Sequence, residues 1–223
     1  MSQTVVTCGW ICLFLPLGAV AVIALGGNSF SRRAAGVIST GSVALSFVAA
    51  VVAFAAMLTE EPSDREHLST AWTWLSAGNI HFGLSILVDP LSVFMMLIVS
   101  GVGGLIVLYS IGYMHGDDEE RRYFAYMALF VFSMLMLVEG GNLLLLLAGW
   151  GLVGLSSYLL IGFWHERPSA VAAAKKAFVM NASGNHVWSG SWADLATAPP
   201  RRPSATRIST VCDSLGAAAK TVA

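Results

Sequence analysis

The sequence predicts an all-α membrane protein with about five transmembrane helices, and two observations predict it. Apolar residues make up 56% of the chain and charged residues only 11%, against roughly a quarter charged in soluble domains. The few charges leave long uncharged windows, and a transmembrane helix needs about 20 mostly apolar residues. The chain is therefore expected to reside in a lipid bilayer as a multi-pass protein.

Each predicted transmembrane helix occupies a window between charged residues. The five windows run from the amino terminus to Arg32, from Arg33 to Glu60, from Asp89 to Asp117, from Arg122 to Glu139, and from Glu139 to Glu166. The first window has no Lys or Arg before it and no convincing cleavage site of small residues after it, so we interpret it as a retained anchor rather than a secretion signal. The first two helices form a predicted segment 1–60, and the last three a predicted segment 87–166.

Basic residues gather in alternate connections and predict the orientation. The connections after the first, third and fifth windows hold Arg32, Arg33, Arg121, Arg122, Arg167, Lys175 and Lys176. The connections on the other side hold only Arg65. Because Lys and Arg favour the cytoplasmic side of a membrane, the amino terminus is expected outside the cytoplasm.

Residues 61–86 are predicted to form an outer loop with a short β-hairpin, because aromatic and β-branched residues flank Gly78-Asn79. Asp89-Pro90 then opens the third helix, since Asp is a good N-cap and proline suits the first helical turn. Beyond the fifth helix, residues 167–180 are expected to begin a sixth helix. Residues 181–223 are rich in Ser, Ala, Thr, Pro and Arg and are predicted to be a disordered cytoplasmic tail.

Three runs of sequence carry a family resemblance that is concentrated in residues 87–178. LVDPLSVFMML with LYSIGYMHGD, then SSYLLIGFW, then AAAKKAF resemble the L subunit of bacterial NADH:quinone oxidoreductase, the antiporter-like arm of respiratory complex I. The switch to unrelated text after about residue 180 suggests a truncated or frameshifted reading frame. In that interpretation residues 181–223 are not homologous to the family.

The resemblance implies a proton path and also shows a departure from it. Lys176 aligns with the family lysine, and Lys175 precedes it, so both are candidates for the path; they could equally be topology signals at the start of a helix. Gly151 stands where the family has a glutamate buried in the membrane. Because glycine cannot titrate, transport through this part of the path is expected to be impaired.

Two further acids are weaker candidates. Asp89 matches the family run DPLS but is better explained as a helix cap, and Glu139 in VEGGN is better explained as a solvated carboxylate in a turn. Cys8, Cys12 and Cys212 have neither metal-ligand nor disulfide spacing, so no metal site is predicted. No catalytic residue is predicted either.

The expected function is that of a membrane subunit in the bacterial inner membrane, contributing to proton translocation coupled to NADH oxidation and quinone reduction. The resemblance places NADH, FMN, iron–sulfur clusters and quinone on other subunits, so no cofactor is expected on this chain, and the isolated chain is not expected to be catalytic. The expected partners are other membrane subunits of complex I and the lipid bilayer, not nucleic acid. Two alternatives stay open: a fragment of the large subunit of a multisubunit sodium/proton antiporter, and an inert membrane fragment.

Overall fold

The computed structural model describes residues 2–26, 32–59, 67–77 and 80–197. Within these residues the elements follow in the order α1 Ser2–Gly26, α2 Arg32–Leu58, β1 His67–Ala77, β2 Ile80–Val88, α3 Pro90–Tyr113, α4 Glu120–Glu139, α5 Leu143–Ile161 and α6 Pro168–Thr197. The chain divides into two compact units, Met1–Ser156 and Ser157–Ala223.

Five helices, α1 to α5, are long and apolar enough to cross a membrane, which confirms the predicted fold class. Their apolar windows contain few charges because the charged residues of this region lie in the connections or at the ends of the helices. Side chains such as Val37, Leu105 and Tyr109 are 64%, 68% and 73% exposed. Exposed apolar surface on this scale fits contact with lipid rather than with water.

In the first unit, α4 is the most enclosed of the five helices, with half of its apolar window buried. It contacts α1, α2 and α3. Small and hydroxyl residues bring these helices together: Ser46 on α2 donates to the backbone carbonyl of Cys12 on α1 at 3.1 Å, and Ser39 donates to that of Phe124 on α4 at 3.3 Å. Such contacts replace the hydrophobic drive that is absent between helices in lipid.

The glycines of α3 also allow close packing. A Cβ placed on Gly101 would lie 3.0 Å from the ring of Phe47 on α2, and one on Gly103 would lie 3.4 Å from Val131 on α4. Helix α3 therefore packs closely against α2 and α4 at these two glycines, where a larger residue would have to displace its neighbour.

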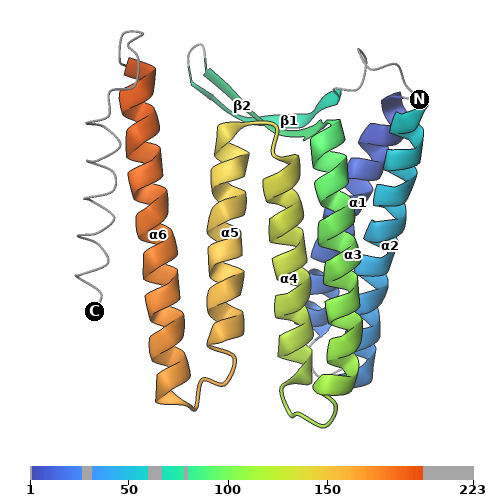
Figure 1. Cartoon of the computed structure of the whole chain (residues 1–223), viewed down its shortest axis with the longest axis vertical. Helices are drawn as coiled ribbons and strands as arrows, with labels where there is room; N and C mark the ends of the chain where they lie inside the picture. The colour runs from blue at the N-terminus through green and yellow to red at the C-terminus, as the bar shows by residue number, and fades with distance from the viewer. Residues whose placement is uncertain (1, 27–31, 60–66, 78–79, 198–223) are drawn as a thin grey trace. The chain divides into compact units, whose positions relative to one another are not determined.

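The two strands form an antiparallel hairpin across the end of the first unit at which α1 begins (Figure 1). His67 pairs with Val88 and Ala77 pairs with Ile80, with two register irregularities inside β1. The hairpin was predicted within residues 61–86; its predicted turn at Gly78-Asn79, like residues 61–66, lies outside the described residues. We call the end of the first unit that carries β1 and β2 the hairpin end, and the end that carries Arg33 and Arg121 the basic end.

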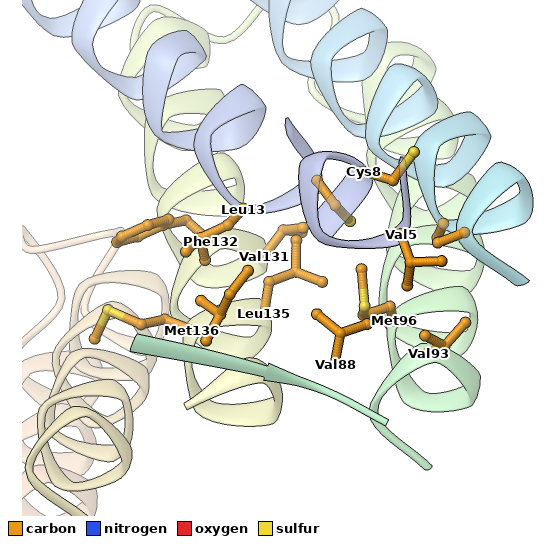
Figure 2. Close-up of a cluster of buried hydrophobic side chains, with 14 of the residues drawn as sticks. Val5, Cys8, Leu13, Val88, Val93, Met96, Val131, Phe132, Leu135 and Met136 are labelled. Atoms are coloured by element: carbon orange, nitrogen blue, oxygen red, sulfur yellow. The ribbon is translucent and has the colours of Figure 1, made fainter. Parts of the chain in front are cut away.

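A hydrophobic core lies close to the hairpin (Figure 2). It joins Val5 and Leu13 of α1 to Val93 of α3 and Leu135 of α4, and Val88 brings strand β2 into the same cluster. Because β2 contributes to this core, the hairpin is packed onto the helix ends rather than projecting from them.

In the second unit, α6 continues beyond the point at which we expected an irregular tail. It runs from Pro168 to Thr197, so residues 181–197 are helical instead of disordered. No proline interrupts the sequence between Ser169 and Pro199, and Ala, Leu, Met and Lys in this stretch favour helix. Residues 198–223, the rest of the predicted tail, lie outside the described residues.

Candidate functional site

Asp89 forms the N-cap that its position before proline predicts. Its Oδ1 accepts a hydrogen bond from the backbone N–H of Ser92 at 2.7 Å, and the backbone N–H of Asp89 donates to the Ser92 hydroxyl at 2.8 Å. This reciprocal capping box satisfies amide groups that the first turn of α3 would otherwise leave unpaired. The cap accounts for an acid at this position without a transport role.

Glu139 differs from its sequence-based interpretation. We expected a solvated carboxylate in a turn, but the side chain is 0% exposed and is among the largest fully buried side chains of the described residues. Neither carboxylate oxygen has a hydrogen-bond partner within the described part of the chain. The prediction was wrong because the helix end that carries Glu139 is covered by other elements.

Helix α1 provides one wall around Glu139. A Cβ placed on Gly9 would lie 3.8 Å from Oε2 of Glu139, and 3.1 Å from both Ile86 and Val88 of β2. The thiol of Cys12, one helical turn further along α1, is fully buried and within electrostatic range of the Glu139 carboxylate. The absence of a side chain at Gly9 therefore lets α1 approach the carboxylate and the strand together.

The turn after Glu139 is fastened to β2. Gly140 forms an isolated antiparallel bridge with Ile86, and the backbone N–H of Gly141 donates to the carbonyl of Ser85 at 2.9 Å. A Cβ on Gly141 would lie 2.9 Å from that same carbonyl oxygen, so the approach requires glycine. The hairpin thus covers the helix end directly at Glu139.

Asn142 completes the connection between α4, α5 and the hairpin. Its side-chain amide donates to the carbonyl of Gly83 at 2.7 Å and to the hydroxyl of Ser85 at 3.1 Å. Its Oδ1 accepts from the backbone N–H of Leu145 at 2.8 Å, which caps the start of α5. Polar groups therefore follow the buried acid closely in the chain and are bonded to the hairpin.

Gly151 lies on an exposed face of α5 in the first unit. A Cβ built on this glycine would meet no described atom within 4 Å. The position at which the resembling family has a glutamate therefore has room for a side chain, although this chain places none there.

Lys175 and Lys176 both lie on exposed positions of α6, in the second unit. Their neighbour Ala174 is buried against Gly162, and the ring of Phe178 lies edge-on to Tyr158 with centroids 5.6 Å apart. Lys176 is therefore on the side of α6 away from this contact with the preceding segment of the same unit, and Lys175 lies to one side of it.

Within the described residues, no group of three or more His, Cys, Asp or Glu is placed to hold a metal ion. Sequence reasoning missed the enclosure of Glu139. One signal could have suggested it: Gly9, Gly140 and Gly141 are positions without side chains, as close backbone approach requires, but nothing in the sequence pairs them.

Two family models match the chain. Residues 74–124 match the family described as NADH-Ubiquinone oxidoreductase (complex I), chain 5 N-terminus. Residues 140–187 match the family described as NADH:quinone oxidoreductase/Mrp antiporter, TM. The second match continues past residue 180, so the similarity extends into the segment that we predicted to be non-homologous.

Curated relatives agree with these matches. NADH-quinone oxidoreductase subunit L of Mycobacterium tuberculosis (strain ATCC 25618 / H37Rv) is 41% identical over 176 residues, covering 79% of this chain and 28% of the relative. The protein of the same name from Escherichia coli (strain K12) is 39% identical over 173 residues, covering 78% of this chain and 28% of the relative. The chain thus spans little more than a quarter of the length of these relatives.

A chain in a solved structure of the Mrp complex is similar in fold. The structure of the Mrp complex from Dietzia sp. DQ12-45-1b contains a chain that matches with a TM-score of 0.65 and 23% sequence identity. The match covers 80% of this chain and 18% of that chain. At this identity the likeness shows a shared helical fold.

Proposed function

The resemblance to the L subunit of NADH:quinone oxidoreductase is confirmed by these relatives, and on that premise we propose that this chain is an antiporter-like membrane subunit contributing to proton translocation. The coupled reaction is NADH oxidation with quinone reduction, carried out on other subunits. The observation that carries the proposal is the 41% identity over 176 residues to a curated subunit L. Its partners are other membrane subunits of that complex in a bacterial inner membrane.

Within this proposal the chain is a non-redox subunit. NADH, FMN, iron–sulfur clusters and quinone are bound elsewhere in the complex, and the isolated chain does not catalyse the redox reaction. Lys176, with Lys175 beside it, contributes a positive charge to the proton path on α6. Gly151 leaves out the carboxylate that would bias the proton affinity of a nearby base, so pumping through this part of the path is weakened.

A sodium/proton antiporter remains the second candidate, because the second family model describes both classes and the Mrp complex shares the fold. The curated relatives named above are NADH-quinone oxidoreductase subunits, which favours the first candidate. The two differ in their energy source. A complex I subunit moves protons only when NADH is oxidised, whereas an antiporter exchanges sodium for protons across a membrane without NADH.

The test is made in inside-out membrane vesicles from the organism that encodes the chain. We expect deletion of its gene to lower the number of protons pumped per NADH oxidised, and re-expression of the chain to restore that ratio. An unchanged ratio after deletion would favour the inert fragment instead. Sodium-driven proton movement that is lost on deletion and needs no NADH would favour the antiporter.

A further inference from the structure

The buried carboxylate of Glu139 takes part in none of the hydrogen bonds that hold the described residues of the first unit together. Side chains that are fully enclosed in a helical membrane protein are normally apolar, and an isolated acid there is costly unless it is paired. Glu139 is 0% exposed, and both of its oxygens lack a hydrogen-bond partner within the described residues. Burial of this acid lowers stability, so a chemical role would explain why the chain carries it.

Among the described residues, no Lys or Arg lies close enough to Glu139 to neutralise its carboxylate. Helix α1 contributes the thiols of Cys12 and Cys8 to the buried core. Asp89 precedes α3, and its carboxylate is already used as the helix cap. Strand β1 begins with His67, which has an interaction of its own. No charged residue occurs in three neighbouring segments, which are residues 34–58 of α2, 83–88 of β2 and 143–164 after the turn.

In this environment the neutral acid is the form of the side chain that is less costly to bury. Replacing the negative charge by a proton on one oxygen removes the uncompensated charge and leaves an O–H group. Glu139 is therefore suited to hold a proton, and no group of three or more His, Cys, Asp or Glu in the described residues is placed to hold a metal ion instead.

The connection that follows Glu139 carries polar groups and is bonded to the hairpin. The carboxylate lies on the last residue of α4, and the next three residues form the turn that is bonded to β2. Asn142 and Ser85 place an amide and a hydroxyl on the hairpin side of this turn, and Asn142 is only partly buried. The hydrophobic core of the first unit includes Leu135 and Met136, which precede Glu139 on α4 (Figure 2).

We propose that Glu139 is a protonatable site at the hairpin end of the first unit. The site takes one proton from the aqueous phase on the hairpin side onto a carboxylate oxygen, and returns it to the same phase past Asn142 and Ser85. As a step in translocation this inference rests on the proposed function, because the site would load or release protons on one side of the membrane. It is distinct from Gly151, twelve positions further along the chain, where no acid is present.

The direct test reads the proton on Glu139 without reading transport. Membrane vesicles that contain the whole complex are studied by infrared difference spectroscopy, with the pH changed on the hairpin side only. We expect a carbonyl stretching band of a protonated carboxylic acid that responds to this change, is lost in Glu139→Gln and is retained at a shifted frequency in Glu139→Asp. Glu120→Gln is the matched control, because Glu120 is the acid buried at the opposite end of α4, with 3% exposure, and its replacement should leave the band in place.

Two outcomes overturn the inference: identical spectra of the parent protein and Glu139→Gln, or a Glu139 band that responds only to pH at the basic end. A parallel measurement of protons pumped per NADH should show a lower ratio for Glu139→Gln than for Glu139→Asp. If gene deletion lowers that ratio but Glu139→Gln changes neither spectrum nor ratio, the proposed function stands and the site fails. If the band is present but gene deletion leaves pumping unchanged, the protonatable site stands and the proposed function fails.

Discussion

At the scale of the residue, Asp89 can be assigned either to helix capping or to proton transfer, and substitution separates the two. Asp89→Ala removes the acceptor for the Ser92 amide and should lower the free energy of unfolding by about 0.5–2 kcal/mol. Asp89→Asn keeps an acceptor oxygen and should stay close to the parent protein in both stability and pumping. Thermal unfolding of the purified complex in detergent measures the first quantity, and proton pumping per NADH the second. Loss of pumping in Asp89→Asn at unchanged stability would contradict the assignment of Asp89 to helix capping alone.

Gly149 and Gly151 form a matched pair, two residues apart on one helix, for which the structure predicts opposite sensitivities. A Cβ on Gly149 would lie 2.9 Å from the backbone nitrogen of Leu137, so Gly149→Ala must push α4 and α5 apart and should cost about 1–3 kcal/mol. Gly151→Ala meets open space and should be tolerated. Melting temperatures of the two variants in detergent check this; equal losses would contradict the close contact between α4 and α5.

The open space at Gly151 also makes the missing acid testable. Gly151→Glu should fold, because a Cβ at this position meets no described atom within 4 Å, and should raise the number of protons pumped per NADH if the carboxylate is what this part of the path lacks. Gly151→Gln is the control, since it has the same shape without the charge. An equal ratio in the Glu and Gln variants would remove Gly151 from the explanation of weakened pumping.

At the scale of the element, sequence and structure agree where the signal is local. Asp89 before Pro90 predicts a capped helix start because both effects act within one turn, and the charge-free windows predict five helices because burial in lipid depends on composition. Glu139 shows why other features could not be predicted. A charge followed by two glycines marks a helix end, but only the folded position of β2 and of Gly9 determines that this end is covered.

The hairpin is held to the helices by a few hydrogen bonds, and Asn142 carries two of them. Asn142→Asp keeps the Oδ1 that caps α5 at Leu145 but loses the amide that donates to Gly83 and Ser85. We expect faster amide hydrogen exchange in residues 83–88 of Asn142→Asp, with exchange in α5 unchanged. Asn142→Ala should speed exchange in both places, because it removes the cap as well. Unchanged exchange in residues 83–88 of both variants would show that the core contacts of β2 alone hold the hairpin.

At the scale of the whole molecule, the charge distribution of the first unit makes a prediction about its orientation in the membrane. Arg33, Arg121 and Arg122 lie at the basic end, where Arg33 also contacts His115 at 3.2 Å, while the hairpin end carries none of these arginines. Because basic residues favour the cytoplasmic side, the hairpin end and the start of α1 should face away from the cytoplasm. The inference about Glu139 depends on this orientation for the side from which its proton comes.

Two variants that each add one exposed cysteine measure that orientation, since native Cys8 and Cys12 are buried and Cys212 can be replaced by serine. Thr70→Cys places an exposed thiol on β1 at the hairpin end, and Asp118→Cys places one at the basic end. In spheroplasts a membrane-impermeant maleimide should label Thr70→Cys at once and Asp118→Cys only after the membrane is permeabilised. The reverse pattern would place the hairpin in the cytoplasm, and the proton held by Glu139 would then be exchanged with the cytoplasmic phase.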